Sequence, residues 1–116
     1  MTGSDVCSSD LALKLNSASN LTAVGYQALY NNTTGVQSTA IGYLALYSNT
    51  TGYNNTAVGY QACQNGVGTL SNTGIGQSAL ASATSNSNTA IGSGALSSMT
   101  SGGNNCAIGE IGRAHV

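Results

Sequence analysis

The sequence predicts an all-β fold, a parallel β-solenoid of about six coils of 17 residues each. Three observations predict it: a tripeptide that recurs at nearly constant spacing, short apolar positions bounded by Asn, Gly, Ser and Thr, and a nearly uncharged composition. The tripeptide is Ala-(Val/Ile)-Gly, with Gly in place of Ala once, and its final glycines are separated by 17, 17, 17, 16 and 17 residues. Regular spacing over this length indicates a repeat architecture.

Each repeat is expected to form one short strand followed by a polar turn. A helical unit is excluded, because 17 residues are too few for a helix pair and a glycine in every unit would weaken a helix by about 1 kcal/mol. Stacked coils place equivalent residues about 4.8 Å apart. The β-branched position therefore forms one apolar ladder, made of Val24, Ile41, Val58, Ile75, Ile91 and Ile108.

A glycine follows each member of this ladder, namely Gly25, Gly42, Gly59, Gly76, Gly92 and Gly109. Glycine at this point suits a bend, or an approach of two backbones that a Cβ would obstruct. A threonine precedes the motif in five repeats, and a Leu column, with Cys63 in one repeat, is expected to form a second apolar ladder. The pattern leaves open which side of the sheet each alternate residue faces.

Three tyrosines, Tyr26, Tyr43 and Tyr60, follow successive glycines of the motif. Stacked aromatic side chains at a surface could bind a glycan or a protein receptor. The alternative is that they are ladder residues, which pack between coils or between subunits. We favour the second interpretation and keep the first as a possible surface-binding site.

The two ends carry residues that we expect a ligated oligonucleotide to have encoded. Residues 5–11 can be encoded by GAC GTG TGC TCT TCC GAT CT, and the reverse complement of this string, preceded by G, encodes residues 110–116. The string resembles a common sequencing adapter, and such residues are set aside before a fold is considered. We therefore expect a non-repeat segment over residues 1–19, a repeat region over 20–109 and a foreign tail over 110–116, in an internal fragment of a longer protein.

Charge is too scarce for most enzymes. Only 4% of the residues are charged, against about 25% in typical domains. Once the ends are set aside, Lys14 is the sole charged side chain, and the single histidine, His115, lies in the foreign tail. General acid and base catalysis needs such groups in a pocket, so we expect no enzyme, and a hydrolase is the least favoured function.

Binding of nucleic acid, membrane, metal or nucleotide is also not expected. The chain lacks a basic patch, and its apolar runs are far shorter than the ~20 residues that span a bilayer. Gly66-Val67-Gly68 and Gly92-Ser93-Gly94 lack the lysine and helix of a phosphate-binding loop, and the interior holds no Asp for a calcium-binding β-roll. We expect no cofactor.

Association of identical chains is expected from the size of one coil. Each coil buries few large aliphatic side chains, so burial alone does not offset the ordering of 17 residues. Hydrogen bonds between coils supply part of the difference, and a second buried face between subunits would supply more.

Two segments carry a family resemblance. Asn55-Thr56-Ala57-Val58-Gly59-Tyr60-Gln61-Ala62 and Ser38-Thr39-Ala40-Ile41-Gly42-Tyr43-Leu44-Ala45-Leu46 resemble the head repeats of YadA-like trimeric autotransporter adhesins. They are also similar to repeats of bacteriophage tail-fibre proteins. The resemblance implies a left-handed parallel β-roll, a homotrimer, and exposure on a bacterial cell surface or a virion tail fibre. Attachment to a host surface, through a receptor or glycan, is the function that it implies.

A second function class is an ice-binding β-solenoid. The one threonine per coil that precedes the motif forms a regular file of hydroxyl groups, made of Thr22, Thr39, Thr56, Thr73 and Thr89. Proteins of that kind usually show two adjacent threonine ranks. Here the second candidate rank, Thr33-Thr34 and Thr50-Thr51, stops after two coils, so the fibre is the favoured interpretation.

Overall fold

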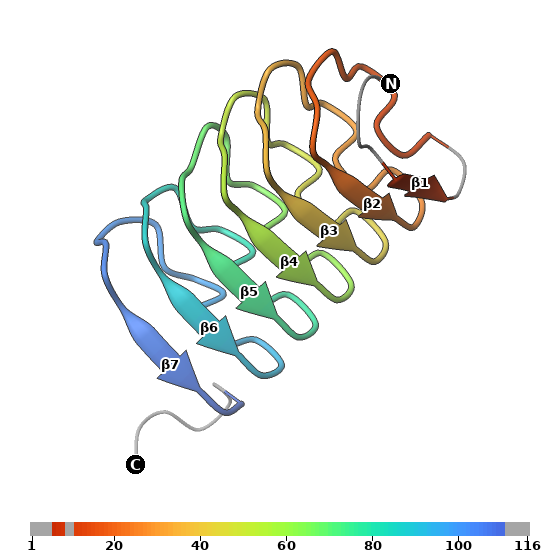
Figure 1. Cartoon of the computed structure of the whole chain (residues 1–116). Helices are drawn as coiled ribbons and strands as arrows, with labels where there is room; N and C mark the ends of the chain where they lie inside the picture. The colour runs from red at the N-terminus through yellow and green to blue at the C-terminus, as the bar shows by residue number, and fades with distance from the viewer. Residues whose placement is uncertain (1–5, 9–10, 111–116) are drawn as a thin grey trace.

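The chain folds as a stack of coils, each of which contributes one three-residue strand to a single parallel sheet (Figure 1). The structure is a computed structural model that describes residues 6–8 and 11–110, with side chains described from residue 11 onward. The strands, which pair in chain order, are β1 Val6–Ser8, β2 Thr22–Val24, β3 Thr39–Ile41, β4 Thr56–Val58, β5 Thr73–Ile75, β6 Thr89–Ile91 and β7 Cys106–Ile108. The predicted all-β solenoid is confirmed, and β2 to β7 enclose about five turns.

The strand register follows the sequence repeat. Thr22 pairs with Thr39 and Val24 with Ile41, and the same pairing continues from coil to coil. The one 16-residue spacing does not disturb it, because Thr73 still pairs with Thr89. The missing residue is therefore absorbed in the turns and not in the sheet.

In β2, β3, β4 and β6 the middle side chain points into the coil, and its two neighbours point outward. Ala23, Ala40, Ala57 and Ala90 have no exposed surface, whereas Thr and Val/Ile on either side of them are half-buried or exposed. Opposite faces alternate along any strand. The question that the sequence left open is thus answered: alanine forms the strand contribution to the core, and the Val/Ile ladder lies on the outer face.

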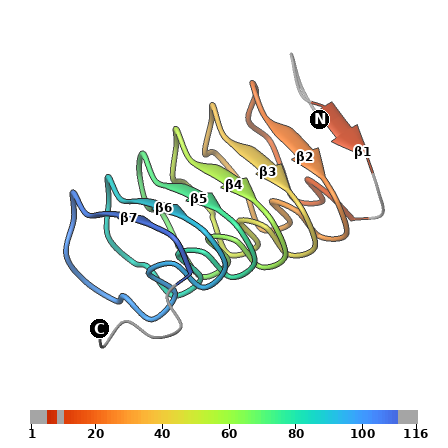
Figure 2. The same ribbon diagram turned by 90° about the horizontal axis from the view of Figure 1, so that it is seen from below.

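The leucine column completes the core from the turns. Leu29, Leu46 and Leu80 are buried, but their φ angles are 52°, 52° and 55°, in the left-handed region. That region costs a non-glycine residue roughly 1–2 kcal/mol, and here backbone hydrogen bonds to the next coil stabilise it, such as Leu29 N to Ala45 O at 3.0 Å. The expected second apolar ladder exists, although its residues lie in turns and not in strands. Figure 2 shows the turns of successive coils stacked beside the sheet.

Asparagines, most of them buried, connect the coils in two columns. In the first, Asn32 Nδ2 donates to Asn16 Oδ1 at 2.7 Å, and Asn49 Nδ2 donates to Asn32 Oδ1 at 3.0 Å. This column ends at Asn49, whose buried Oδ1 has no hydrogen-bond partner. The next coil has Gly66 at the equivalent position.

The second column begins where the first ends. Its members directly precede the strands, and each side-chain oxygen accepts from the backbone N–H of the next member. Asn55 Oδ1 accepts from Asn72 N at 2.9 Å, and Asn72 Oδ1 accepts from Asn88 N at 2.8 Å. Asn88 Oδ1 accepts from Asn105 N at 3.0 Å. These bonds satisfy polar groups that lie inside the coils.

The stack also continues into the segment that we expected to lie outside the repeat. Leu13 is buried, its N–H donates to Ala28 O at 3.1 Å, and Asn16 belongs to the first asparagine column. β1, which lies within the segment expected to be adapter-encoded, pairs with β2. Backbone pairing at a sheet edge does not require particular side chains. Of the expected foreign tail, Glu110 is described, and residues 111–116 lie outside the described residues.

Candidate interaction surface

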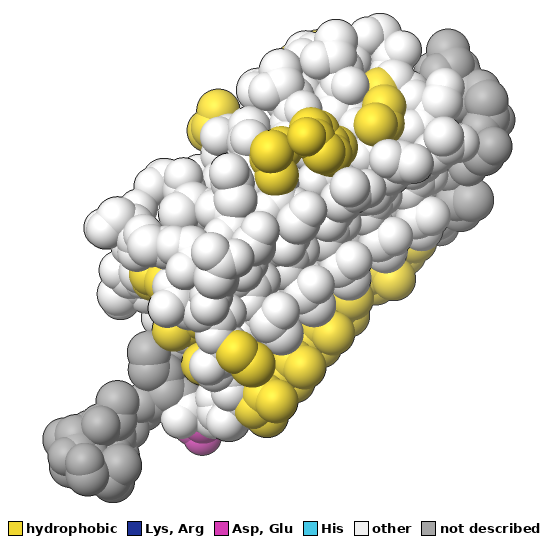
Figure 3. Space-filling model, turned by 60° about the vertical axis from the view of Figure 1, so that its left-hand side comes forward, with side chains coloured by type: hydrophobic (Ala, Val, Ile, Leu, Met, Phe, Trp, Pro, Cys, Tyr) yellow, Lys and Arg dark blue, Asp and Glu magenta, His cyan; other side chains and the backbone are white. Residues whose placement is uncertain are grey.

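The outer face of the sheet carries an uninterrupted apolar stripe. Ile41, Ile75 and Ile91 are 39%, 37% and 37% exposed, and Ile108 is 76% exposed. In the sheet each pairs with the equivalent residue of the adjacent coil, so the six members of the Val/Ile ladder form one row. Figure 3 shows a row of hydrophobic side chains along one side of the molecule. The threonine column lies next to it on the same face.

The glycine column lets the coils approach closely where each strand ends. Gly42 has a φ of 135°, and a Cβ there would lie 2.5 Å from the carbonyl oxygen of Gly59. Gly76 has a φ of 131°, and a Cβ there would lie 2.5 Å from the carbonyl oxygen of Gly92. Both the backbone conformation and the space exclude other residues. The close approach aligns the N–H of Gly42 with Val24 O at 2.7 Å.

The tyrosines at the carboxyl ends of β2, β3 and β4 form a stacked ladder. The ring centroids of Tyr26 and Tyr43 lie 5.5 Å apart, and those of Tyr43 and Tyr60 lie 5.1 Å apart, with interplanar angles of 12° and 8°. The three side chains are 43%, 43% and 47% exposed. Tyr43 is stacked on both faces, and Tyr26 and Tyr60 are each stacked on one face. The middle of the ladder therefore presents mainly ring edges and hydroxyl groups to the surroundings. A sugar that needs a free ring face finds none on Tyr43.

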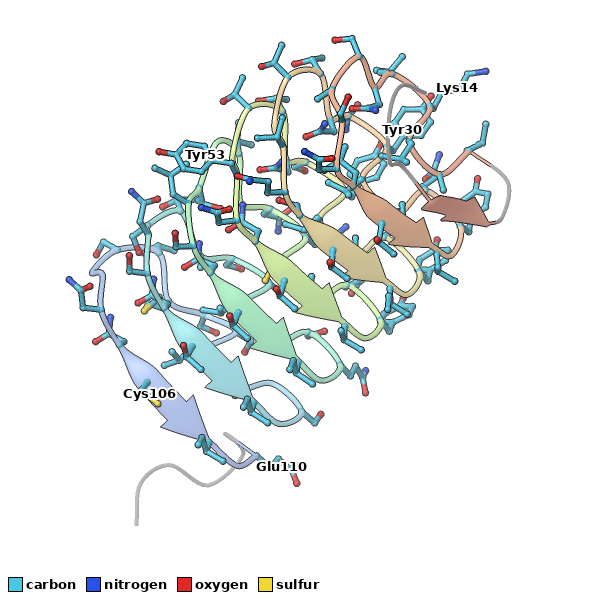
Figure 4. The ribbon with its side chains drawn as sticks, in the orientation of Figure 1. Lys14, Tyr30, Tyr53, Cys106 and Glu110 are labelled. Carbon is cyan, nitrogen blue, oxygen red and sulfur yellow. The ribbon has the colours of Figure 1, made fainter. Side chains whose placement is uncertain are left out.

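A second stacked pair, Tyr30 and Tyr47, lies four residues further along each coil, with ring centroids 5.6 Å apart. All three stacked contacts join residues of adjacent coils, as the ladder interpretation expects. Figure 4 shows Tyr30 near the N-terminal end of the stack, and Tyr53 on a turn of the middle coils.

Charge is almost absent from the surface. Among the described residues only Lys14 and Glu110 carry a charged side chain, and Figure 4 places them at opposite ends of the stack. His115 lies outside the described residues. The strand face between the two ends is neutral, so a second neutral face can approach it without repulsion or loss of solvated charge.

The two described cysteines differ in their exposure to solvent. Cys63 occupies a leucine position and is buried, and this burial raises the pKa of its thiol from 9.0 to about 12, while a hydrogen bond with the backbone of Gly74 lowers it by a smaller amount. Cys106 stands at the threonine position of β7 and is exposed. A thiolate is the reactive form, and burial keeps Cys63 in its thiol form at neutral pH in the folded chain.

Neither the described side chains nor the comparisons with known proteins identify a further site. Within residues 6–8 and 11–110 no three His, Cys, Asp or Glu side chains group in a way that could hold a metal, and no helix there is long and apolar enough to cross a membrane. No protein-family model matches the chain, and neither a curated protein nor a solved structure matches it significantly.

The sequence patterns did not identify the asparagine columns as a structural element. The second column was visible as an Asn before the strand in four successive repeats, Asn55, Asn72, Asn88 and Asn105. Asparagine is so frequent in polar turns that this alignment carried little weight without the structure.

Proposed function

We propose that the chain is a length of shaft from a homotrimeric fibre exposed on a bacterial surface or a virion, as in adhesin heads and phage tail fibres. The observation that carries the proposal is the half-exposed Val/Ile ladder on a neutral face. Contiguous exposed apolar surface on a soluble domain marks an interaction site. Three such faces meeting around an axis would bury the stripe and leave the turns outward.

The strand face also fits the task of extension. Equivalent residues recur once per coil, so identical chains can associate in register along the whole stack without special contacts at one level. Attachment to a host would then depend on the outward turns or on parts of a longer protein.

The experiment compares the mass of the chain in solution with that of two lysine variants. Ile75→Lys would bring three like charges together at the axis, and we expect it to convert a trimer into monomers with unchanged circular dichroism. Val67→Lys is the matched control, because Val67 is 60% exposed and lies in a turn. A wild-type chain that stays monomeric at all concentrations would contradict the proposal.

The outward threonine column favours one other candidate, an ice-binding surface. Threonine and a β-branched residue face outward side by side in β2 to β6, which is a flat and regular array. Its second rank is Val or Ile and not Thr, which is why the fibre is preferred. Thermal hysteresis produced by a monomer would support ice binding instead.

A further inference from the structure

The strand face is too narrow to hold subunits together unaided. Six strands of three residues, at about 3.3 Å per residue and about 4.8 Å per strand, cover roughly 290 Å² in projection. A stable interface buries about 800 Å² on each partner. Residues that flank the strands must therefore contribute to any lasting association through this face.

The two flanks of the sheet differ in chemistry. At the carboxyl ends of β2 to β4 lies the tyrosine edge, which we define as Tyr26, Tyr43 and Tyr60. Two residues before each strand lies the polar edge, whose members are exposed and have φ between 56° and 64°. The polar edge consists of Asn20, Gln37, Asn54, Ser71, Ser87 and Asn104.

Rotational symmetry decides which flanks meet. In a closed three-fold ring of parallel chains each contact is heterologous, so one flank of a subunit faces the opposite flank of the next. The tyrosine edge of one chain thus faces the polar edge of its neighbour. Both edges repeat once per coil, so phenol hydroxyls and ring edges on one side match amide and hydroxyl groups on the other at the same spacing.

We propose that the tyrosine edge is an intersubunit contact, in which Tyr26, Tyr43 and Tyr60 pack against the polar edge of a second copy of this chain. The inference rests on the proposed trimer and names the side chains that complete its interface. Ring geometry supports a protein occupant: both faces of Tyr43 and one face each of Tyr26 and Tyr60 are already stacked, and the exposed edges and hydroxyls suit polar side chains better than the apolar face of a sugar. The tyrosines would then be covered in the fibre.

The first test removes one stacked pair from each ladder. Tyr43→Ser/Tyr60→Ser deletes the pair at the tyrosine edge, and Tyr30→Ser/Tyr47→Ser deletes an equivalent stacked pair elsewhere. Interface tyrosines are frequent hot spots, so we expect the first variant to raise the trimer dissociation concentration by about a hundredfold. The control should dissociate at the wild-type concentration, measured by analytical ultracentrifugation.

The second test needs no substitution and decides the case if both variants lose structure. Hydroxyl-radical footprinting of the wild-type chain, followed by mass spectrometry, compares dilute monomer with assembled trimer. Protection of Tyr43 and Tyr60 on assembly, with Tyr53 unchanged, is the expected result. A trimer in which all three are labelled at the monomer rate overturns the inference while leaving the trimer intact. A chain that never assembles overturns the proposed function as well.

Discussion

The N-terminal coils, residues 11–60, and the C-terminal coils, residues 61–110, share the strand, the glycine column and the buried alanine and leucine columns, but differ in their aromatic and asparagine side chains. All six tyrosines and the first asparagine column lie in the N-terminal coils. The C-terminal coils have Gln77 and Ser93 at the tyrosine positions and are bridged by the second asparagine column. The comparison teaches that backbone stacking requires the strand and the glycine in every coil. The buried asparagines that bond one coil to the next, by contrast, can occupy different positions in the coil.

The largest loss of stability is expected from alanine substitutions in the glycine column. It should be equal in the two regions, because the glycine column runs through both. Gly42→Ala and Gly76→Ala each place a Cβ 2.5 Å from a carbonyl oxygen at a φ that alanine avoids. We expect each to lower the free energy of unfolding by about 4 kcal/mol, measured by urea denaturation.

The control for this pair is Gly68→Ala. Gly68 has a φ of 69°, and its Cβ would meet only Thr51 Oγ1, at 3.2 Å. A cost of about 1 kcal/mol is expected there. If Gly42→Ala and Gly76→Ala differed by several-fold, the glycine column would not act alike in the two regions.

The asparagine columns should differ from each other in a measurable way. The side chain of Asn72 makes two hydrogen bonds of 2.8 Å, one to the N–H of Asn88 and one to the carbonyl of Ser85. Asn72→Ala leaves both of these backbone groups without a partner. Each stranded group costs about 1–3 kcal/mol, so we expect a loss of about 3 kcal/mol. Asn49→Ala also strands two groups, but it removes the unpartnered Oδ1, so its cost should be lower.

The same urea denaturation, run side by side on the two alanine variants, checks this order. Equal losses would mean that Asn49 Oδ1 carries no penalty in the folded chain.

A pH dependence is expected from Cys63, which lies just past the boundary between the two regions. Its pKa rises from 9.0 to about 12 on folding, so its contribution to stability is complete below pH 9 and is lost as the pH rises toward 12. The loss between pH 8 and pH 10 should be about 1 kcal/mol. Cys63→Ala should lack this component, and the difference between the two denaturation profiles isolates it. Parallel profiles would contradict it.

The smallest change in stability is expected from a variant that extends the first asparagine column by one coil. In Gly66→Asn/Thr69→Gly the new amide can donate to the unpartnered Asn49 Oδ1, as Asn49 does to Asn32. We expect a gain of about 1 kcal/mol. Gly66→Asn alone is the control, since its Cβ would lie 2.7 Å from Thr69 Oγ1, and it should be destabilising. A double variant no more stable than wild type would show that Asn49 Oδ1 gains nothing from an added hydrogen-bond donor.

Sequence periodicity was sufficient for the fold and the strand register, because every coil must return to the same point before the next strand. It was insufficient for Leu29 and Leu46, whose left-handed backbone depends on hydrogen bonds to a neighbouring coil. The coil that contains Leu13 and Asn16 was missed because it lacks the Ala-(Val/Ile)-Gly motif. The outward direction of the ladder could not be predicted either, since both alternating positions of the strand are compatible with burial.

The short coil between Gly76 and Gly92 has a consequence for how such a chain can change. One residue is missing there, yet Ile75 still pairs with Ile91. Length changes are thus confined to the turns, where insertions and deletions leave the sheet side untouched. Duplication or loss of a whole coil changes the length of the stack by about 4.8 Å. The turns can diversify freely while the length is set in discrete steps.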